Sequence, residues 1–214
     1  MFDDREEAGK LLGEELKNFI KDKENAVILA IPRGGVPVAY WVSKKTGIPF
    51  GMVVAKKVAF PEDPEAAIGA AAPDGTFVLS DYISESSPRV STAIEKAVQE
   101  AREKLNKYLS GKEPDVEDKT VIIIDDGIAT GYTAIVAGMY AKKKGARKVI
   151  LAVPVCPSDS INKVKKIFDE VICYHKVDSI FFAVGAYYRD FHQVSDEELL
   201  YYLNKAKEEG LLYL

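Results

Sequence analysis

The chain has 214 residues, of which 47% are hydrophobic and 29% are charged, the balance of an ordinary folded domain rather than of a disordered chain. Its 29 basic and 33 acidic residues give a formal net charge of −4 and are interspersed along the sequence. General binding of nucleic acid is therefore not expected, because it needs a clustered cationic surface. The apolar runs have the length of strands, far below the roughly 20 residues that span a bilayer, so no membrane segment is expected. The N-terminal residues are acidic, unlike a signal peptide, and we expect a cytoplasmic protein.

Cysteine and histidine are scarce in this chain. Cys156 and Cys173 are the only cysteines, and they lie in separate apolar segments without the CxxC spacing of redox or zinc sites. We interpret both as small buried apolar side chains. Because the only histidines are His175 and His192, a metal would need oxygen ligands, which favours magnesium or manganese.

Helical and strand patterns alternate along the first half of the chain. An aspartate at position 3 or 4 can cap a helix that ends near residues 21–23, and a continuous apolar run at 26–31 predicts a buried strand. A helix is expected after residue 35, and a second buried strand at 50–55 runs directly into two lysines. Pro61 and Pro64 then mark a loop, which we expect to be mobile, and residues 73–75 mark the turn of a hairpin.

The second half continues the alternation. Pro88 opens a long helix that Gly111 closes, and the remaining segments are a strand at 120–125, a helix at 131–145, and strands at 148–155 and 170–174 around a helical stretch at 158–168. This order predicts an α/β fold with a doubly wound, mainly parallel sheet of about five strands, flanking helices and a flexible loop and hairpin. In such folds ligands bind at the carboxyl ends of the strands.

The strongest motif spans residues 121–133, where a buried strand is followed by two aspartates and a glycine-containing loop. The last five residues of the motif form a tight turn before a helix: Ala129, Thr130, Gly131, Tyr132 and Thr133. Small side chains let backbone N–H groups approach an anion at a helix N-terminus, and the two threonine hydroxyls can donate to it. We call residues 129–133 the cradle. Its spacing fits neither a Walker loop nor the GxGxxG pattern of dinucleotide folds.

Two adjacent carboxylates, Asp125 and Asp126, come directly before the cradle. Like charges about 4 Å apart repel by roughly 4 kcal/mol at an effective dielectric constant of 20, so a neutral or cationic group is expected between them and the bound phosphate. A sugar phosphate meets this requirement, because its hydroxyl groups donate to the carboxylates while its phosphate enters the cradle.

With these residues the sequence resembles the type I phosphoribosyltransferases, whose signature is a hydrophobic strand, two acidic residues and a loop ending in TGxT or TGxS. The resemblance covers residues 26–174, and the tail at 184–198 together with the Pro-Arg-Gly-Gly stretch at 32–35 resembles a less characterised branch of the family. It implies a single domain over residues 1–214 with a core at 26–174. A small hood is expected to consist of the C-terminal residues 175–214 together with the N-terminal helix. By analogy with the family, a homodimer is expected.

The resemblance implies phosphoribosyl pyrophosphate and magnesium as ligands. Asp125 and Asp126 would hold the ribose hydroxyls and the metal, partly through water, and the cradle would hold the 5-phosphate. Arg33, Gly34 and Gly35 would line the pyrophosphate, and Lys56 or Lys57 would cover it as it leaves. The catalytic assignment of the resemblance is Asp125, Asp126 and Lys57, with closure of the loop at 61–64 excluding water.

Each of these residues also has a structural interpretation. An aspartate pair often caps a helix, Pro-Arg-Gly-Gly is a common tight turn, and paired lysines are usually solvated. Packing is the favoured role of three aromatic side chains of the tail, Tyr187, Tyr188 and Phe191. His192 is interpreted as a polar surface residue.

The leading hypothesis from the sequence is transfer of a phosphoribosyl group to a nucleobase-like nitrogen acceptor, with release of pyrophosphate, in nucleotide salvage. Ala129 stands where the family's 6-oxopurine enzymes usually have an aspartate, which disfavours hypoxanthine and guanine, and adenine and uracil enzymes carry alanine there. Two alternatives remain: a non-catalytic regulator that senses phosphoribosyl pyrophosphate or a nucleotide, and a sugar-phosphate hydrolase or phosphorylase. The acceptor base stays open.

Overall fold

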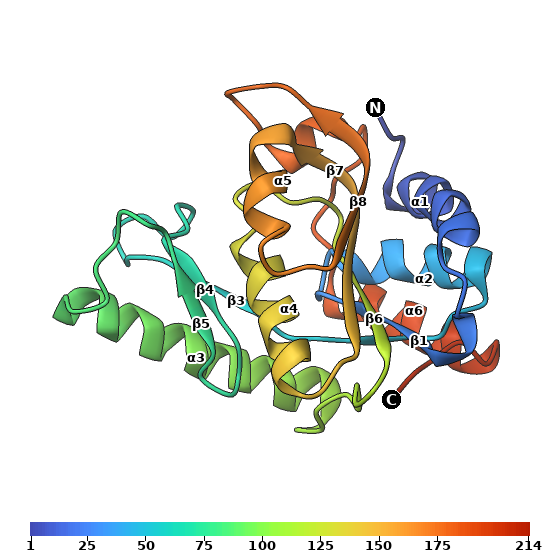
Figure 1. The fold of residues 1–214 in the computed structure, drawn as a ribbon, viewed down its shortest axis with the longest axis horizontal. Helices are drawn as coiled ribbons and strands as arrows, with labels where there is room; N and C mark the ends of the chain where they lie inside the picture. The colour runs from blue at the N-terminus through green and yellow to red at the C-terminus, as the bar shows by residue number, and fades with distance from the viewer.

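A computed structural model that describes all of residues 1–214 contains a five-stranded parallel sheet and a separate three-stranded antiparallel sheet (Figure 1). The parallel sheet has the strand order β2-β1-β6-β7-β8. Its strands are β1 (Ala26–Ala30), β2 (Phe50–Met52), β6 (Thr120–Ile124), β7 (Lys148–Pro157) and β8 (Glu170–Val177). All neighbouring strands run parallel, so their carboxyl ends meet at one edge. The predicted α/β class with five parallel strands is confirmed.

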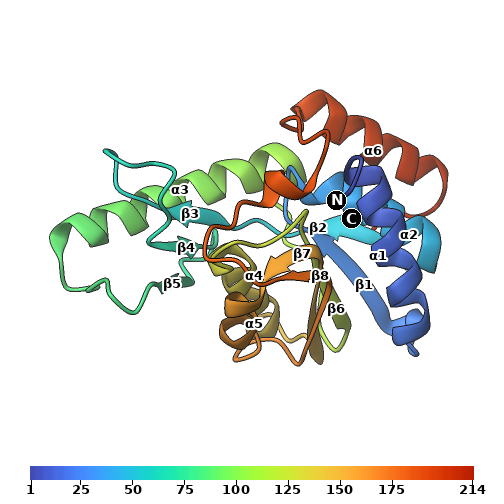
Figure 2. The same cartoon turned by 90° about the horizontal axis from the view of Figure 1, so that it is seen from above.

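Helices cover both faces of this sheet (Figures 1 and 2). One face carries α1 (Arg5–Phe19), α2 (Gly35–Thr46) and α6 (Asp196–Glu208), and the other carries α4 (Tyr132–Lys143) and α5 (Ser158–Val164). In β1, Ile28 packs in the core under the first group of helices, whereas Val27 and Leu29 pack in the core under the second. Because both faces are covered, the strand is a continuous apolar run without polar alternation.

The antiparallel sheet stands apart from the parallel one with helix α3 (Pro88–Leu109) along it (Figure 2). Its strands β3 (Lys56–Val58), β4 (Gly69–Ala71) and β5 (Phe77–Leu79) are adjacent in chain order. The predicted hairpin turn at residues 73–75 joins β4 to β5. Successive residues of β4 face opposite sides, so that Ala71 packs against α3 and Ala70 joins the core under α4.

One prediction about these elements was wrong, and one element was missed. The predicted strand at residues 50–55 stops at Met52, and the chain crosses to the second sheet, where the lysines begin β3. Residues 53–55 are buried without belonging to a strand, so their apolar character did not mark the end of β2. Helix α6 was not anticipated as an element, although Ser195 caps it through a hydrogen bond from the Glu198 N–H. No helix is long and apolar enough to span a membrane.

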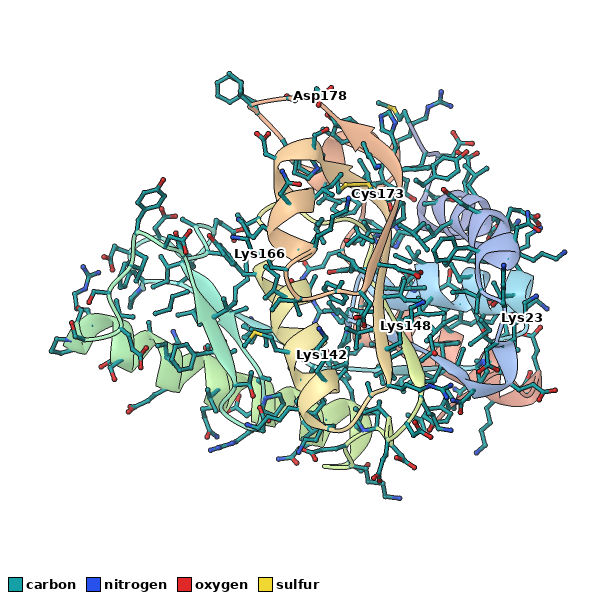
Figure 3. The ribbon with its side chains drawn as sticks, in the orientation of Figure 1. Lys23, Lys142, Lys148, Lys166, Cys173 and Asp178 are labelled. Carbon is teal, nitrogen blue, oxygen red and sulfur yellow. A yellow bond between two sulfur atoms is a disulfide. The ribbon has the colours of Figure 1, made fainter.

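The two cysteines are buried, as predicted, but the prediction that they are separate apolar side chains was wrong. Cys156 and Cys173 lie on the neighbouring strands β7 and β8, and a disulfide joins them (Figure 3). Their Cα atoms are 6.3 Å apart. The sequence did not indicate this proximity, because a helix separates the two strands in the chain and only the β7–β8 pairing brings the cysteines together.

Candidate functional site

Loops from two neighbouring strands meet at the carboxyl edge of the parallel sheet. Asp125 and Asp126 directly follow β6, and the loop at residues 32–35 joins β1 to α2. A Cβ atom on Gly34 would collide with Oδ2 of Asp126, so glycine allows the two loops to approach this closely. The peptide bond between Pro32 and Arg33 is cis. The structure thus brings the predicted aspartates and the Pro-Arg-Gly-Gly loop into one site.

Both aspartates are held by hydrogen bonds. Oδ1 of Asp125 accepts from the backbone N–H of Asp126 at 2.8 Å, and Oδ2 of Asp126 accepts from Nε of Arg5 at 3.1 Å. The Nη1 atom of Arg5 also donates to the carbonyl of His192 at 2.7 Å, and the Tyr188 hydroxyl donates to the backbone carbonyl of Asp126 at 2.6 Å. The N-terminal helix and the C-terminal tail therefore both support this carboxylate pair.

The surroundings of the two carboxylates raise their pKa values. Burial raises the pKa of Asp125 well above its usual range, and the neighbouring charge of Asp126 adds to the increase. Burial also raises the pKa of Asp126, although the Arg5 guanidinium opposes that increase. Arg5 neutralises Asp126, whereas Asp125 has no cationic partner and favours a hydroxyl donor or a cation beside it.

The cradle lines a small cavity of about 130 Å³. Its wall consists of residues 127–133 together with Lys57 from β3 and Ala67 from the β3–β4 loop. Gly131 has φ = +83°, a left-handed conformation that suits glycine, and it immediately precedes α4. This cradle cavity therefore combines a lysine ammonium group with the N-terminus of a helix, two features that attract an anion.

A second cavity, of about 330 Å³, borders Asp126. We call it the cationic cavity, and it is lined by Arg5, Arg33, Gly34, Lys104, Asp126, Phe191, Gln193 and Val194. The basic side chains in this wall come from α1, the β1–α2 loop and α3, whereas Asp126 is its one carboxylate. This charge balance favours an anionic group with several oxygen acceptors.

The two predicted lysines lie on opposite sides of β3, as successive strand residues must. Lys57 faces the cradle cavity, and its Nζ atom is 3.9 Å from Glu65 Oε2. Lys56 faces α3, where its Nζ atom is 3.5 Å from Glu100 Oε2 and its charge acts on Lys104. The structure therefore separates the two ammonium groups and directs only Lys57 to the cradle.

Two basic residues of the cationic cavity, Arg5 and Lys104, were missed by the sequence analysis. Lys104 is half-buried on α3, and desolvation, followed by the charges of Lys56 and Arg33, lowers its pKa to about 8. It is the third residue after the buried Ala101, a spacing that places it beside the apolar stripe of α3. That position was the only available signal, since neither residue belongs to a local motif.

The aromatic side chains of the tail have different roles. Tyr188 is buried and packs against Phe2, in agreement with the packing interpretation, while Tyr187 stacks on Phe182. Phe191 instead lines the cationic cavity, with the Arg5 guanidinium 4.2 Å from its ring centroid. The His192 ring contacts Asp190 and Glu198, and these hydrogen bonds raise its pKa.

The donor set of the site fits magnesium. Asp125 and Asp126 supply carboxylate oxygens, and no three histidine, cysteine or carboxylate side chains of the chain are grouped as ligands of one metal ion. Magnesium is commonly bound through one or two carboxylates together with water and substrate phosphates. A cation there would also offset the mutual repulsion that raises the pKa of Asp125.

Comparisons with known proteins identify the family. The phosphoribosyl transferase domain family matches residues 4–190, so the chain belongs to the phosphoribosyltransferases, with the fold of type I. A Mycobacterium tuberculosis protein named "Putative phosphoribosyl transferase Rv0571c" is 36% identical over 214 residues. That alignment covers 98% of this chain but 48% of the mycobacterial protein, so the chain spans about half the length of the curated relatives that it matches.

Solved structures support the same fold. The crystal structure of TT1426 from Thermus thermophilus is 32% identical, with a TM-score of 0.77 and coverage of 95% of this chain and 98% of that chain. A hypothetical protein from Neisseria gonorrhoeae with bound ppGpp is 17% identical, with a TM-score of 0.54 over 98% of this chain and 94% of that chain. The similarity to the Neisseria gonorrhoeae protein, at 17% identity, is a similarity of fold alone.

Proposed function

We propose that this protein transfers the phosphoribosyl group of phosphoribosyl pyrophosphate to a nitrogen atom of a small, nucleobase-like acceptor and releases pyrophosphate. The observation that carries the proposal is the pair of cavities next to the aspartate pair, one bordered by Asp126 with three basic side chains and one beginning at Gly127 with Lys57 in its wall. The substrate has a matching order of groups, with a 5-phosphate at one end, ribose hydroxyls in the middle and pyrophosphate at the other end. Membership of the phosphoribosyltransferase family supports the same assignment.

Each group of the substrate has a proposed protein partner. The 5-phosphate enters the cradle, formed by Ala129, Thr130, Gly131, Tyr132 and Thr133, where Lys57 adds positive charge. The ribose hydroxyls donate to Asp125 and Asp126. The pyrophosphate occupies the cationic cavity beside Arg33, Gly34 and Gly35, with Lys104 in its wall and Lys56 close to Lys104.

The chemistry follows from the charges that develop during transfer. As the bond between ribose C1 and the pyrophosphate oxygen breaks, positive charge grows on the ribose and negative charge grows on the leaving group. Asp125 and Asp126 stabilise the first charge, and the basic groups of the cationic cavity stabilise the second. Magnesium bound by the aspartates, partly through water, would add positive charge beside the pyrophosphate. The acceptor nitrogen bonds to C1 as pyrophosphate leaves, and the proton that this nitrogen carried passes to the pyrophosphate or to water.

Ala129 supports a restriction on the acceptor. Its methyl side chain offers no proton acceptor to a base, so 6-oxopurines are not the proposed substrates. The proposal treats residues 1–214 as one phosphoribosyltransferase-like domain of a cytoplasmic homodimer that acts in nucleotide salvage without binding nucleic acid.

The decisive experiment measures pyrophosphate release from phosphoribosyl pyrophosphate and magnesium. Release is measured without an acceptor and then with adenine, guanine, hypoxanthine, xanthine, uracil or orotate. We expect one base to stimulate release above the level without an acceptor. Measurable release that is equal with and without every base would instead indicate hydrolysis by water and would contradict the proposed transfer.

A non-catalytic regulator that senses phosphoribosyl pyrophosphate or a nucleotide is the second candidate function. The observation that favours it is the Arg5–Asp126 ion pair, because one of the two proposed ribose ligands is already engaged. The Neisseria gonorrhoeae protein, of the same fold, has bound ppGpp. Tight binding of phosphoribosyl pyrophosphate or of a nucleotide, with no pyrophosphate release across the panel, would support this candidate over the enzyme.

A further inference from the structure

Helix α5 contacts the cradle through two side chains that the proposed function does not use. Ser160 is buried, and its hydroxyl donates to the backbone carbonyl of Ala129 at 2.5 Å. One turn further along, Nζ of Lys163 donates to the carbonyl of Thr130 at 3.0 Å. Two consecutive carbonyl groups of the cradle are therefore held by the same helix.

These contacts determine the orientation of two peptide groups. In a trans peptide the carbonyl of one residue and the N–H of the next point in opposite directions, and the chain's one cis bond lies elsewhere. The Ala129 carbonyl points to Ser160, so the N–H of Thr130 points away from α5. Likewise, the Thr130 carbonyl points to Lys163, and the N–H of Gly131 points away from α5.

The cradle cavity does not border α5, the helix from which these N–H groups point away. Its lining includes the cradle, Lys57 and Ala67 but no residue of α5. The N–H groups of Thr130 and Gly131 donate to no protein acceptor, whereas the N–H of Ile128 donates to the Val155 carbonyl. Among the free N–H donors of the cradle, these two belong to peptide groups whose carbonyls bond to α5.

Further contacts hold α5 against the cradle. A Cβ atom added to Gly131 would lie 3.0 Å from Cγ1 of Val164, so the helix packs directly on this glycine. The Lys163 ammonium lies 4.5 Å from the ring centroid of Tyr132. Lys163 therefore has a defined place over the cradle.

We propose that Ser160 and Lys163 are positioning residues that orient the Thr130 and Gly131 N–H groups for the phosphate ester of the substrate. The inference rests on the proposed function, because it assigns the 5-phosphate to the cradle. Neither side chain touches the ligand, and each acts through a carbonyl of the cradle. Without these bonds the two peptide groups can rotate, and the donors lose their common direction.

Binding measurements on the full chain can separate this role from a general structural one. We would titrate ribose 5-phosphate and, separately, pyrophosphate into the wild type and into Ser160→Ala and Lys163→Met by calorimetry. Each variant is expected to bind ribose 5-phosphate about five- to tenfold more weakly, the usual effect of losing one orienting hydrogen bond, and to bind pyrophosphate as the wild type does. Ser160→Thr and Lys163→Arg keep the donors and should restore most of the affinity.

Lys166→Met is the matched control for charge. Lys166 lies two residues after the end of α5, on the side that faces the antiparallel sheet (Figure 3). It makes no hydrogen bond to the cradle, unlike Lys163. If Lys166→Met weakens ribose 5-phosphate binding as much as Lys163→Met does, positive charge alone explains the effect and the inference is overturned. Lys163 is not fully buried, so its variant tests the positioning role at the next peptide group even if Ser160→Ala does not fold.

The outcomes distinguish the inference from the proposed function. Wild-type affinity for ribose 5-phosphate in both variants would overturn the positioning role and leave the proposed function intact. No binding of ribose 5-phosphate or phosphoribosyl pyrophosphate by the wild type would overturn the proposed function and the positioning role together. A selective loss for ribose 5-phosphate, with recovery in the conservative variants, would support both.

Discussion

Nε of Arg5 donates to Oδ2 of Asp126 over 3.1 Å, and this ion pair joins residues 121 positions apart in the chain. Both side chains are largely buried, and Arg5 also bonds to the carbonyl of His192. The first residue of α1 is therefore part of the wall that surrounds the proposed ribose site. The pair neutralises one carboxylate of the aspartate pair and leaves Asp125 without a cationic partner.

Replacing Arg5 by methionine should destabilise the fold. Asp126 would lose its cationic partner, and we expect the free energy of unfolding to decrease by about 2–3 kcal/mol, the usual contribution of a hydrogen bond to a charged group. Urea unfolding would measure the change. The control is Arg189→Met, which removes an exposed ion pair with Asp3 and should change stability by less than about 0.5 kcal/mol. Equal losses in both variants would contradict the structural role of Arg5.

Asp125→Asn should stabilise the protein while weakening substrate binding. Burial raises the pKa of Asp125, so between the unfolded and folded pKa values the folded state binds more protons than the unfolded state. The contribution of Asp125 to the free energy of unfolding therefore falls as the pH rises through that window and stays low at higher pH. Asparagine carries no charge, and we expect the variant to be about 1 kcal/mol more stable at pH 8, with the difference shrinking toward pH 4.

Chemical unfolding at both pH values tests the stability effect, and titration with phosphoribosyl pyrophosphate tests the binding effect. Asp178→Asn changes an aspartate directly after β8 that lines neither cavity, and it should alter neither property. A less stable Asp125→Asn protein at pH 8 would refute the assignment of an unfavourable buried charge. Unchanged affinity would refute the ribose role.

Lys104 should make pyrophosphate binding depend on pH near 8. Its pKa is lowered to about 8, so the side chain is charged below that pH and loses its proton above it. Because only the charged form attracts an anion, we expect the wild type to bind pyrophosphate progressively less well than Lys104→Arg between pH 7 and pH 9. Arginine stays charged over this range. The ionisation of pyrophosphate affects both proteins equally, so its effect cancels in the ratio of the two affinities. A ratio independent of pH would exclude Lys104 from the site.

Gly34→Ala should impair binding through Asp126. The added methyl group would collide with Oδ2 and lie 3.0 Å from Cγ of that carboxylate, although the backbone at φ = −61° accepts alanine without strain. We expect loss of phosphoribosyl pyrophosphate binding of tenfold or more, with the protein still folded. Calorimetry combined with circular dichroism would measure both properties. Normal affinity in a folded variant would contradict the close approach of the two loops.

Removing the disulfide should lower stability without abolishing binding. The bridge between Cys156 and Cys173 closes a loop with a sequence separation of 17, for which chain entropy predicts about 3 kcal/mol of stabilisation. The double variant Cys156→Ser with Cys173→Ser should lose about that amount in urea unfolding. The wild type under reducing conditions should match it. Thiol titration of the unreduced protein that finds two free thiols would contradict the bridge.

The sequence predicted those parts of the molecule whose signals are local. Continuous apolar runs marked the central strands, and the pattern of strand, two aspartates and glycine loop marked the cradle at residues 129–133. Asp4 caps the first helix and Pro88 begins α3, as the capping preferences indicated. In these cases the residues that determine the structure are neighbours in the chain.

The parts that were not predicted depend on contacts between distant segments. The Arg5–Asp126 pair, the disulfide and the position of Lys104 all require the final arrangement of elements, which a single sequence does not specify. The end of β2 was missed for a related reason. Residues 53–55 are buried by tertiary packing rather than by strand pairing, and apolar composition does not separate the two causes.

The register of strand β3 determines which of its two lysines faces the cradle cavity. Lys56 pairs with Ala71 and Lys57 with Ala70, and the pleat directs one ammonium group to each side of the strand. A slip of one residue in this pairing would exchange the two groups, so that Lys56 would face the cradle cavity and Lys57 would face α3. The register of a three-residue strand therefore determines which lysine adds its charge to the wall of the cradle cavity and which one adds its charge to the surroundings of Lys104.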